Sequence, residues 1–317
     1  MIKRPTAFVL GAGASRPYGF PTARELLTGV RKSLATEQTF RVRLLDSDFN
    51  EAEIESLRSS LIGSPVGSVD EFLEIRDHAR LVKVGKAAIA AYLLPREVAL
   101  NLLPDTQDDD WYEYLFRRMK EGASTLNDFL QNAISFVTFN YDRSLEKFLF
   151  GGLCSTYGAT PAQVATAWKR ARMQIVHVYG SFGPLPELGG TLSYGVEPNF
   201  SGLLLRQAAD SIHIVGEPGA QAGIDAAQDV LMRCERVCFL GFGYRPANVD
   251  RLGLKTTLLK DVRVFGSSYK TLSGERGDIK RMFEALGHDI VLANPDANAL
   301  DALRALPVLS PFDLADL

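Results

Sequence analysis

The sequence predicts an α/β fold in which helices cover both faces of a parallel sheet, and three observations predict it. After residue 131, short apolar runs alternate with segments of helical periodicity. Near the N-terminus, an apolar run at residues 8–10 ends in a glycine-rich turn and is followed by a helix start. Between residues 36 and 130, Leu, Ala, Glu and Arg recur at a spacing typical of helices. We therefore expect a parallel sheet with a large helical insertion after its first strand–helix unit.

The N-terminal strand runs into residues 11–15 (GAGAS), and a helix is expected over residues 22–35. Thr22 and Glu25 have the spacing of a capping box, which indicates where this helix begins. A glycine turn after a strand brings backbone N–H groups close to a bound phosphate, but an isolated Gly-x-Gly fits an ordinary strand–helix turn equally well. Arg16 stands where the common dinucleotide fingerprint has its third glycine, which disfavours an ordinary dehydrogenase.

The insertion is expected to be helical, with no strand of its own. One helix, over residues 69–75, has Ser68 as its cap and Glu71 three residues later. The other helical patterns cover residues 57–62, 87–94, 111–119 and 124–132. Three aspartates at 108–110 could bind a metal, but negative charge at the start of the following helix is the favoured interpretation.

The second half of the chain alternates between expected strands and helices. Strands are expected at residues 134–139, 174–179, 211–215, 236–240, 262–265 and 289–292. Helices are expected at residues 144–150, 224–235 and 278–286, the last of them stopped by Gly287. We therefore assign residues 1–30 and 131–317 to one Rossmann-like domain and residues 31–130 to the helical insertion.

The composition is that of an ordinary globular protein, with 46% hydrophobic and 23% charged residues in a chain of 317. A net charge of −3 provides no general attraction to nucleic acid, so no direct nucleic-acid binding is expected. No apolar run approaches the roughly 20 residues of a membrane helix, and no membrane association is expected. A signal peptide would be cleaved within the glycine turn, so a cytoplasmic location is expected.

Three scattered cysteines, Cys154, Cys234 and Cys238, form no C-x-x-C pair. They cannot build a four-cysteine zinc site or a disulfide framework within the chain. We expect buried free thiols, as in a reducing cytoplasm, and no metal site.

Polar and small residues occur where the expected strands end. In an open parallel sheet these ends share one edge, and ligands bind there. Asn140 and Asp142 follow one strand, and His177 lies near the end of the next. Small residues that would let a ligand approach the backbone follow several strands: Gly11, Gly13, Ser15, Gly180, Ser181, Gly241, Gly243, Gly266 and Ser267. A dinucleotide fits this set, with backbone donors for its phosphates and polar side chains for a ribose.

Each of these residues, taken alone, also has a purely structural interpretation. Asn140 and Asp142 could cap the following helix. His177 could pack in the core, and Gly241 and Gly243 could serve only as turn residues. Their order along the chain is what favours a functional site.

This order resembles the sirtuin (Sir2-like) superfamily, whose members carry G-A-G-x-S, G-I-P-D-F-R, T-Q-N-I-D and H-G-S motifs in succession. Residues 11–15 (GAGAS) match the first motif, and residues 19–21 (GFP) begin the second. Residues 138–142 (TFNYD) match the third, and residues 177–181 (HVYGS) are a looser form of the fourth. Order and approximate spacing agree over most of the chain outside residues 31–130.

Two departures separate the chain from the protein-deacylating sirtuins. Residues 182–210 contain no cysteine, so the four-cysteine zinc module of that branch is absent. Thr22 and Ala23 replace the Asp and Phe of the D-F-R segment, while Arg24 is kept. The chain is more similar to the zinc-less Sir2-like effectors of bacterial anti-phage systems. That resemblance implies cleavage of NAD+ to nicotinamide and ADP-ribose, by a homo-oligomer or with a partner protein of the same defence operon, such as an ATPase.

The resemblance also implies roles for individual residues. Asn140 would position the ribose and a water, Asp142 would hold the carboxamide of nicotinamide, and His177 would act as general base. NAD+ would be the substrate, without zinc. The residues expected to bind it are Gly11, Ala12, Gly13, Ser15, Pro21, Arg24, Ser181, Gly241, Gly243, Gly266 and Ser267.

Two other functions stay open at this point. One is a protein-lysine deacylase or ADP-ribosyltransferase with the same cofactor, although the missing zinc module counts against it. The other is a non-catalytic sensor that binds NAD+ or ADP-ribose and scaffolds a complex. The expected function is NAD+ hydrolysis that defends the cell against phage by depleting NAD+.

Overall fold

Six strands form a parallel sheet in the computed structural model, which describes residues 1–103, 108–195 and 200–310. In chain order the strands are β1 (Thr6–Leu10), β2 (Ile134–Thr138), β3 (Gln174–His177), β4 (Arg236–Leu240), β5 (Arg263–Gly266) and β6 (Ile290–Leu292). Their order across the sheet is β3-β2-β1-β4-β5-β6. The predicted Rossmann-like α/β fold is thereby confirmed.

The direction in which strands are added reverses between β1 and β4. The chain builds outward from β1 through β2 to β3, then returns to β4 and continues on the other side of β1. Phe8 of β1 lies in register with Phe136 of β2 and Cys238 of β4. All of β1 is buried, because a central strand is covered on both faces. Open sheets of this kind bind ligands beyond the carboxyl ends of the strands at the reversal point.

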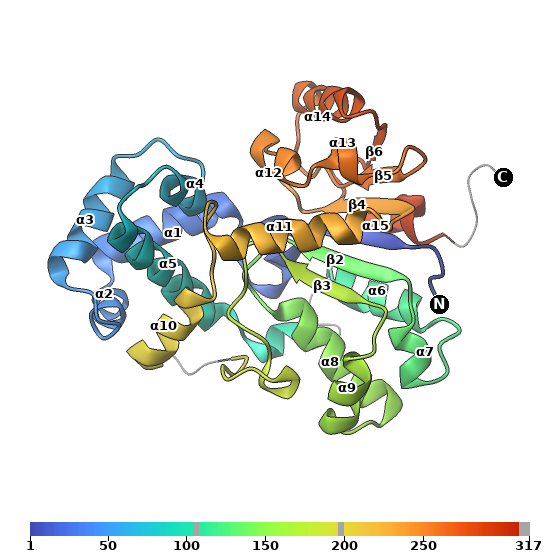
Figure 1. The fold of residues 1–317 in the computed structure, drawn as a ribbon, viewed down its shortest axis with the longest axis horizontal. Helices are drawn as coiled ribbons and strands as arrows, with labels where there is room; N and C mark the ends of the chain where they lie inside the picture. The colour runs from blue at the N-terminus through green and yellow to red at the C-terminus, as the bar shows by residue number, and fades with distance from the viewer. Residues whose placement is uncertain (104–107, 196–199, 311–317) are drawn as a thin grey trace.

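Helices cover both faces of the sheet, as predicted (Figure 1). One layer contains α11 (Pro218–Leu231), which packs on β2 and β3, with α12 (Pro246–Arg251), α13 (Leu254–Thr257) and α14 (Ser273–Ala285). The other layer contains α6 (Trp111–Lys120), α7 (Leu126–Leu130), α8 (Ser144–Tyr157), α9 (Pro161–Trp168) and α15 (Ala299–Ala305). Two layers follow from right-handed crossovers once the strand order reverses. None of the described helices has the length and apolar character needed to cross a membrane.

A further group of helices, which we call the helical lobe, lies beyond the carboxyl ends of the strands (Figure 1). It consists of α1 (Ala23–Thr36), α2 (Gln38–Leu45), α3 (Glu51–Ile62), α4 (Val69–Glu74), α5 (Ala79–Leu93) and α10 (Gly202–Asp210). α5 is central and packs against the other five. The lobe thus includes α10 from outside residues 31–130 and α1, which crosses the boundary at residue 31. In contrast, α6 and α7 from inside that range belong to a layer of the sheet. Residues 31–103 and 108–130 contain no strand, as expected.

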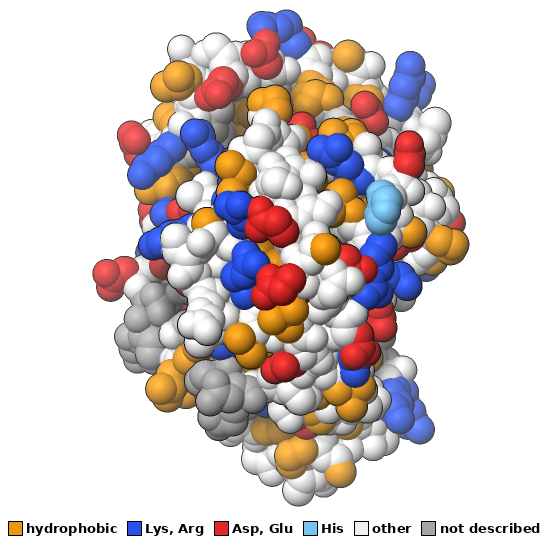
Figure 2. Space-filling view, turned by 90° about the vertical axis from the view of Figure 1, so that its left-hand side faces the viewer, with side chains coloured by type: hydrophobic (Ala, Val, Ile, Leu, Met, Phe, Trp, Pro, Cys, Tyr) orange, Lys and Arg blue, Asp and Glu red, His pale blue; other side chains and the backbone are white. Residues whose placement is uncertain are grey.

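Ion pairs between neighbouring helices lie on the outer surface of the helical lobe. Arg41 pairs with Glu51, and Arg80 pairs with Glu53. Figure 2 shows this end of the molecule, where Lys and Arg side chains lie beside Asp and Glu side chains. Charges of both signs are therefore mixed on this face, in agreement with the small net charge.

Local sequence signals identify several helix starts. Thr22 and Glu25 form the predicted capping box of α1, and the side chain of Ser68 caps α4. Asp110 caps α6 and also accepts a hydrogen bond from Tyr18 Oη at 2.9 Å. The helix-start interpretation of the aspartate run is confirmed for Asp110. Short 3-10 helices complete the described elements, at Ala12–Tyr18, Leu94–Arg96, Ala99–Leu102, Pro186–Leu188 and Pro307–Leu309.

The strand predicted at residues 211–215 is wrong. This segment is a loop after α10, and its only β contact among the described residues is an isolated antiparallel bridge between Ile212 and Gly180. Ile212 and Ile214 are buried while the residues between and beside them are less so. Because alternate residues face the core in any extended segment, the apolar alternation did not distinguish a buried loop from a strand.

A buried ion pair joins the start of α8 to the chain near the helical lobe. The side chains of Arg143 and Glu97 are 1% and 0% exposed, and Arg143 Nε donates to Glu97 Oε1 at 2.9 Å. Arg143 Nη1 also donates to the Leu192 carbonyl at 2.7 Å, which holds the loop after β3. Burial raises the pKa of Glu97, and the hydrogen bonds and charge of Arg143 oppose that rise.

Removing one partner of this pair is expected to destabilise the fold strongly. Arg143→Met leaves the Glu97 carboxylate buried without its cation, so the free energy of unfolding should fall by about 3–5 kcal/mol. Chemical denaturation measures the change. Arg281→Met is the matched control, because it breaks a pair with Asp278 whose side chains are 68% and 69% exposed and should change little. Equal losses in the two variants would contradict the assignment.

Candidate functional site

A cleft of about 1200 Å³ opens at the reversal point of the sheet, between the carboxyl ends of the strands and α4 of the helical lobe. Ligand sites are typically concave clefts of hundreds of Å³ or more. The predicted residues that line the cleft are Gly11, Ala12, Gly13, Ser15, Pro21, Arg24, Asn140, Asp142, Gly241, Gly243 and Ser267. Three other predicted residues, His177, Ser181 and Gly266, do not line it.

Two glycine loops lie at the base of the cleft and pack directly on each other. Gly13 N donates to Gly241 O at 3.0 Å, and Gly11 N donates to Leu240 O at 3.0 Å. A Cβ on Gly11 would lie 2.5 Å from Gly241 O, and a Cβ on Gly241 would lie 2.0 Å from Ala14 N. Gly241 also has a φ of +56°, which other residues rarely adopt. The contact between the loops therefore requires these glycines.

This contact limits what the first glycine loop offers to a phosphate. The N–H groups of Gly11, Gly13 and Ala14 all donate to protein carbonyls. They are therefore engaged within the protein in this structure, and phosphate binding by this loop needs other donors. The expectation that this loop brings backbone N–H groups to a phosphate stays a prediction, and the structure adds a packing role for its glycines.

Two cationic side chains at the mouth of the cleft are available for an anion. Arg24 and Lys270 line the cleft and are exposed. Within residues 1–103, 108–195 and 200–310, neither forms an ion pair. Arg245 and Arg251 also line the cleft, but each is paired with a glutamate of α4. An anionic ligand would therefore meet Arg24 and Lys270 without displacing a carboxylate.

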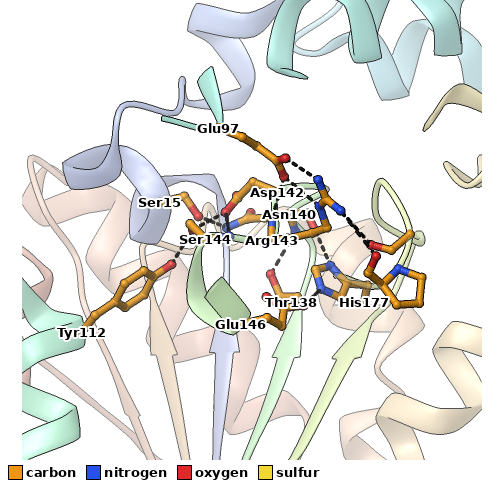
Figure 3. A network of polar contacts seen from close by, with 12 residues as sticks. Ser15, Glu97, Tyr112, Thr138, Asn140, Asp142, Arg143, Ser144, Glu146 and His177 are labelled. Atoms are coloured by element: carbon orange, nitrogen blue, oxygen red, sulfur yellow. Dashed lines mark hydrogen bonds and ion pairs between the residues drawn. The ribbon is translucent and has the colours of Figure 1, made fainter. Parts of the chain in front are cut away.

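Asn140 extends from the end of β2 to the first glycine loop (Figure 3). Its Nδ2 donates to Gly11 O at 3.0 Å and to Ser15 Oγ at 2.9 Å. Its backbone N donates to Thr138 Oγ1 at 3.0 Å. No described residue donates to Asn140 Oδ1, so the amide oxygen can accept a hydrogen bond from a ligand.

Asp142 lies in the same cleft and is only 7% exposed. Its Oδ1 accepts hydrogen bonds from Ser144 N at 3.1 Å and from Ser144 Oγ, and the Ser15 hydroxyl also bonds to its carboxylate. Burial raises the pKa of Asp142, while the bonds from the two serines oppose the rise. The N-cap of α8 is Arg143, which forms no side-chain cap bond, so Asp142 is not the helix cap considered from the sequence. It lies one residue earlier, and its bond to Ser144 N supports the start of α8 from the cleft.

His177, at the end of β3, lies between the Asn140 backbone and Glu146 and contacts an acceptor on each (Figure 3). Its Nδ1 is 2.7 Å from Asn140 O, and its Nε2 is 2.6 Å from Glu146 Oε1. Because a carbonyl and a carboxylate both accept, this arrangement favours the protonated imidazole, in which both ring nitrogens donate. Burial favours the neutral ring, but the Glu146 carboxylate outweighs it and raises the pKa of His177. In this geometry the His177 ring holds the backbone carbonyl of Asn140 in place.

Tyr179 and His213 line the cleft, although the sequence did not single them out. Tyr179 stands directly before Gly180, where the H-G-S motif has its histidine, and its Oη accepts from Arg251 Nη1 at 3.0 Å. A stricter alignment of that motif would have pointed to position 179. His213 reaches the cleft because its backbone N donates to Tyr179 O at 2.9 Å. No local sequence signal indicates that long-range contact.

The remaining predicted residues have structural contacts. Ser267 Oγ accepts a hydrogen bond from Gly241 N at 2.9 Å, so it supports the second glycine loop. Gly266 lies against Tyr244, whose Oη would be 2.0 Å from a Cβ at that position. Ser181 is half-buried outside the cleft.

No group of three or more His, Cys, Asp or Glu side chains that could hold a metal ion occurs in the described part of the chain. Cys154, Cys234 and Cys238 are free thiols; the last two are buried, as predicted, and Cys154 is partly exposed. Models of known protein families and curated proteins show no match to the chain.

Gly241 and Gly243 offer a matched pair of substitutions. Gly241→Ala places a Cβ 2.0 Å from Ala14 N at a positive φ, so the free energy of unfolding should fall by more than about 1 kcal/mol. A Cβ on Gly243 meets nothing within 4 Å, so Gly243→Ala should leave stability nearly unchanged. Thermal or chemical unfolding of the two variants measures the difference. Similar losses in both would contradict the loop contact.

The His177–Glu146 pair predicts how stability depends on pH. Because the pKa of His177 is raised in the fold, its stabilisation is fully present below the unfolded value of about 6.5 and is lost as pH rises through the folded value. Glu146→Gln removes the carboxylate that raises it. The difference in unfolding midpoint between the unmodified protein and Glu146→Gln should therefore shrink as pH rises above about 6.5. Calorimetry across pH tests this, and a pH-independent difference would contradict it.

Proposed function

We propose that the protein hydrolyses NAD+ to nicotinamide and ADP-ribose. The position of Asn140 carries the proposal, because its side chain bonds to Gly11 and Ser15 at the reversal point of a Rossmann-like sheet. The two motifs that resemble Sir2-like proteins most closely, GAGAS and TFNYD, therefore share one cleft. Asp142 of the second motif lies in that cleft as well.

NAD+ fits the cleft in size and chemistry. The cleft has a volume of about 1200 Å³, which lies above the usual range of about 300–1000 Å³ for small-ligand sites. It therefore has room for the two joined nucleotides of NAD+. Arg24 and Lys270 would bind the pyrophosphate as unpaired cations at the mouth. Gly243, with open space beside its Cα, would let a ribose approach the backbone.

Hydrolysis requires little covalent chemistry from the protein. Cleavage of the nicotinamide–ribose bond leaves positive charge on the sugar, and the protein must stabilise that charge and place a water. The unpaired Asn140 Oδ1 would hold the water or a ribose hydroxyl, and Asp142 would hold the nicotinamide carboxamide. Asn140 is fixed from two sides, by the glycine loop and by His177, so its amide is oriented before the substrate binds.

Asn140→Ala should therefore lower NAD+ cleavage by about 100-fold or more and leave the fold intact. Release of nicotinamide and ADP-ribose by the purified protein, followed by chromatography, measures the rate, and thermal unfolding checks the fold. Ser181→Ala, outside the cleft, is the control and should cleave at the unmodified rate. His177→Ala should also lower the rate, because it frees the Asn140 carbonyl. Unmodified turnover by Asn140→Ala would overturn the proposal.

The same assay separates the other functions considered from the sequence. ADP-ribose formed from NAD+ alone supports hydrolysis, whereas turnover that requires an acyl-lysine peptide supports deacylation. Binding of NAD+ in calorimetry without turnover, even with a co-expressed partner, supports a sensor.

The resemblance to anti-phage effectors extends the proposal to the cell. We infer that the protein works in the cytoplasm by depleting NAD+ during phage infection, as a homo-oligomer or with a partner such as an ATPase. This part rests on the resemblance alone. NAD+ levels in infected cells that carry the unmodified chain or Asn140→Ala test it, and light scattering of the purified protein gives its oligomeric state.

A further inference from the structure

His213 stands beside the end of β3, although it belongs to the loop after α10. Its backbone N donates to Tyr179 O at 2.9 Å, and its neighbour Ile212 forms an antiparallel bridge with Gly180. The His213 side chain lines the cleft and is 33% exposed. An accessible imidazole is therefore held at the end of β3, and Asn140 and Asp142 follow the end of the neighbouring strand β2 and line the same cleft.

The other residues at this edge are poorly suited to take up a proton. Both ring nitrogens of His177 contact acceptors, and this ring does not line the cleft. Tyr179 lines the cleft, but burial raises its pKa, so its phenol stays protonated at neutral pH. Asp142 is held by Ser144 and Ser15. His213 is the accessible group at this edge that can be neutral and basic near pH 7.

The charges that face His213 come from two elements. Glu217, before α11, places Oε2 3.9 Å from His213 Nδ1, and Lys86 of α5 lies 3.1 Å from Glu217. Burial lowers the pKa of His213, the positive charge of Lys86 lowers it further, and Glu217 opposes both. The ring is therefore neutral at physiological pH.

We propose that His213 accepts the proton of the water that attacks the ribose, in the hydrolysis proposed above, on which this inference rests. The C1′–N bond breaks and its electron pair goes to nicotinamide, which leaves as a neutral base. The water oxygen forms the new C1′–O bond, and its proton passes to the His213 imidazole. The imidazolium then releases that proton to solvent through the open side of the cleft.

The position of the His213 ring depends on Gly219 in the first turn of α11. A Cβ on Gly219 would lie 2.4 Å from His213 Cε1 and 2.5 Å from Nε2. An alanine at this position would be compatible with the helix but would displace the ring. Gly219 therefore lets the imidazole lie flat against the helix, and it provides a substitution that moves the ring without removing it.

The test measures the pH dependence of NAD+ cleavage in variants of the full chain. The rate of NAD+ cleavage by the unmodified protein should fall as pH drops through the lowered pKa of His213. We call this fall in rate at low pH the acidic limb of the pH profile. His213→Ala should lower kcat by about 100-fold or more and abolish the acidic limb. Added imidazole should restore part of the rate. Lys86→Met should move the limb to higher pH, because it removes the positive charge that lowers the pKa of His213. His177→Ala should lower the rate and keep the limb.

Two further variants distinguish the effect of moving the His213 ring from the effect of placing an alanine in a helix. Gly219→Ala should reduce kcat in the same direction as His213→Ala, with little change in unfolding temperature. Gly151→Ala is the matched control, because it is also a helical glycine and its added Cβ meets nothing within 4 Å. It should leave the rate unchanged.

NMR provides a readout that does not need turnover. The chain has four histidines, so each imidazole signal can be assigned by single substitution. His213 should titrate below its ordinary value and His177 above it, and added ADP-ribose should shift the His213 signal.

The outcomes distinguish the two proposals. An active unmodified protein whose His213→Ala variant keeps both rate and acidic limb overturns the role of His213 and leaves NAD+ hydrolysis standing. An ADP-ribose shift at His177 alone likewise overturns it. An unmodified protein without turnover, alone or with its co-expressed partner, overturns the hydrolysis and this role together.

Discussion

The contact between the two glycine loops is the constraint on which the cleft depends. Gly11 and Gly13 after β1 pack against Gly241 after β4 so closely that a Cβ at any of the three would lie within 3 Å of backbone. This contact holds the two strand ends together where the strand order reverses. It also places Ser15 within reach of Asn140, so the polar residues of the site are oriented by packing of the main chain.

The helical lobe closes one side of that cleft through short α4. Its carboxylates bind groups that belong to the sheet side, with Asp70 contacting Tyr141, Glu71 contacting Arg245 and Glu74 contacting Arg251. These contacts neutralise two arginines inside the cleft, which keeps it from being strongly basic. The charge left for an anionic ligand lies at the mouth, on Arg24 and Lys270, so binding an anion there breaks no existing ion pair.

The two histidines near this site differ because burial and partner charge act on them differently. His177 is inside, where the Glu146 carboxylate overcomes the effect of burial and raises the pKa of the ring. His213 is at the surface of the cleft, where burial and Lys86 favour the neutral ring. The sequence favoured His177 because it precedes a Gly-Ser pair, a local cue. It could not identify His213, since only the fold joins the loop after α10 to the end of β3.

The sequence by itself determined the strands at 8–10 and 134–139, the cap at Thr22 and the clustering of Asn140 with the glycine turn. Periodicity and capping act over a few residues, so a linear chain displays them directly. The tertiary structure decided that the glycines serve loop packing, that residues 211–215 are a loop, and which histidine reaches the cleft. Those outcomes depend on contacts between residues far apart in the chain, whose burial and partners exist only after the sheet and lobe have assembled.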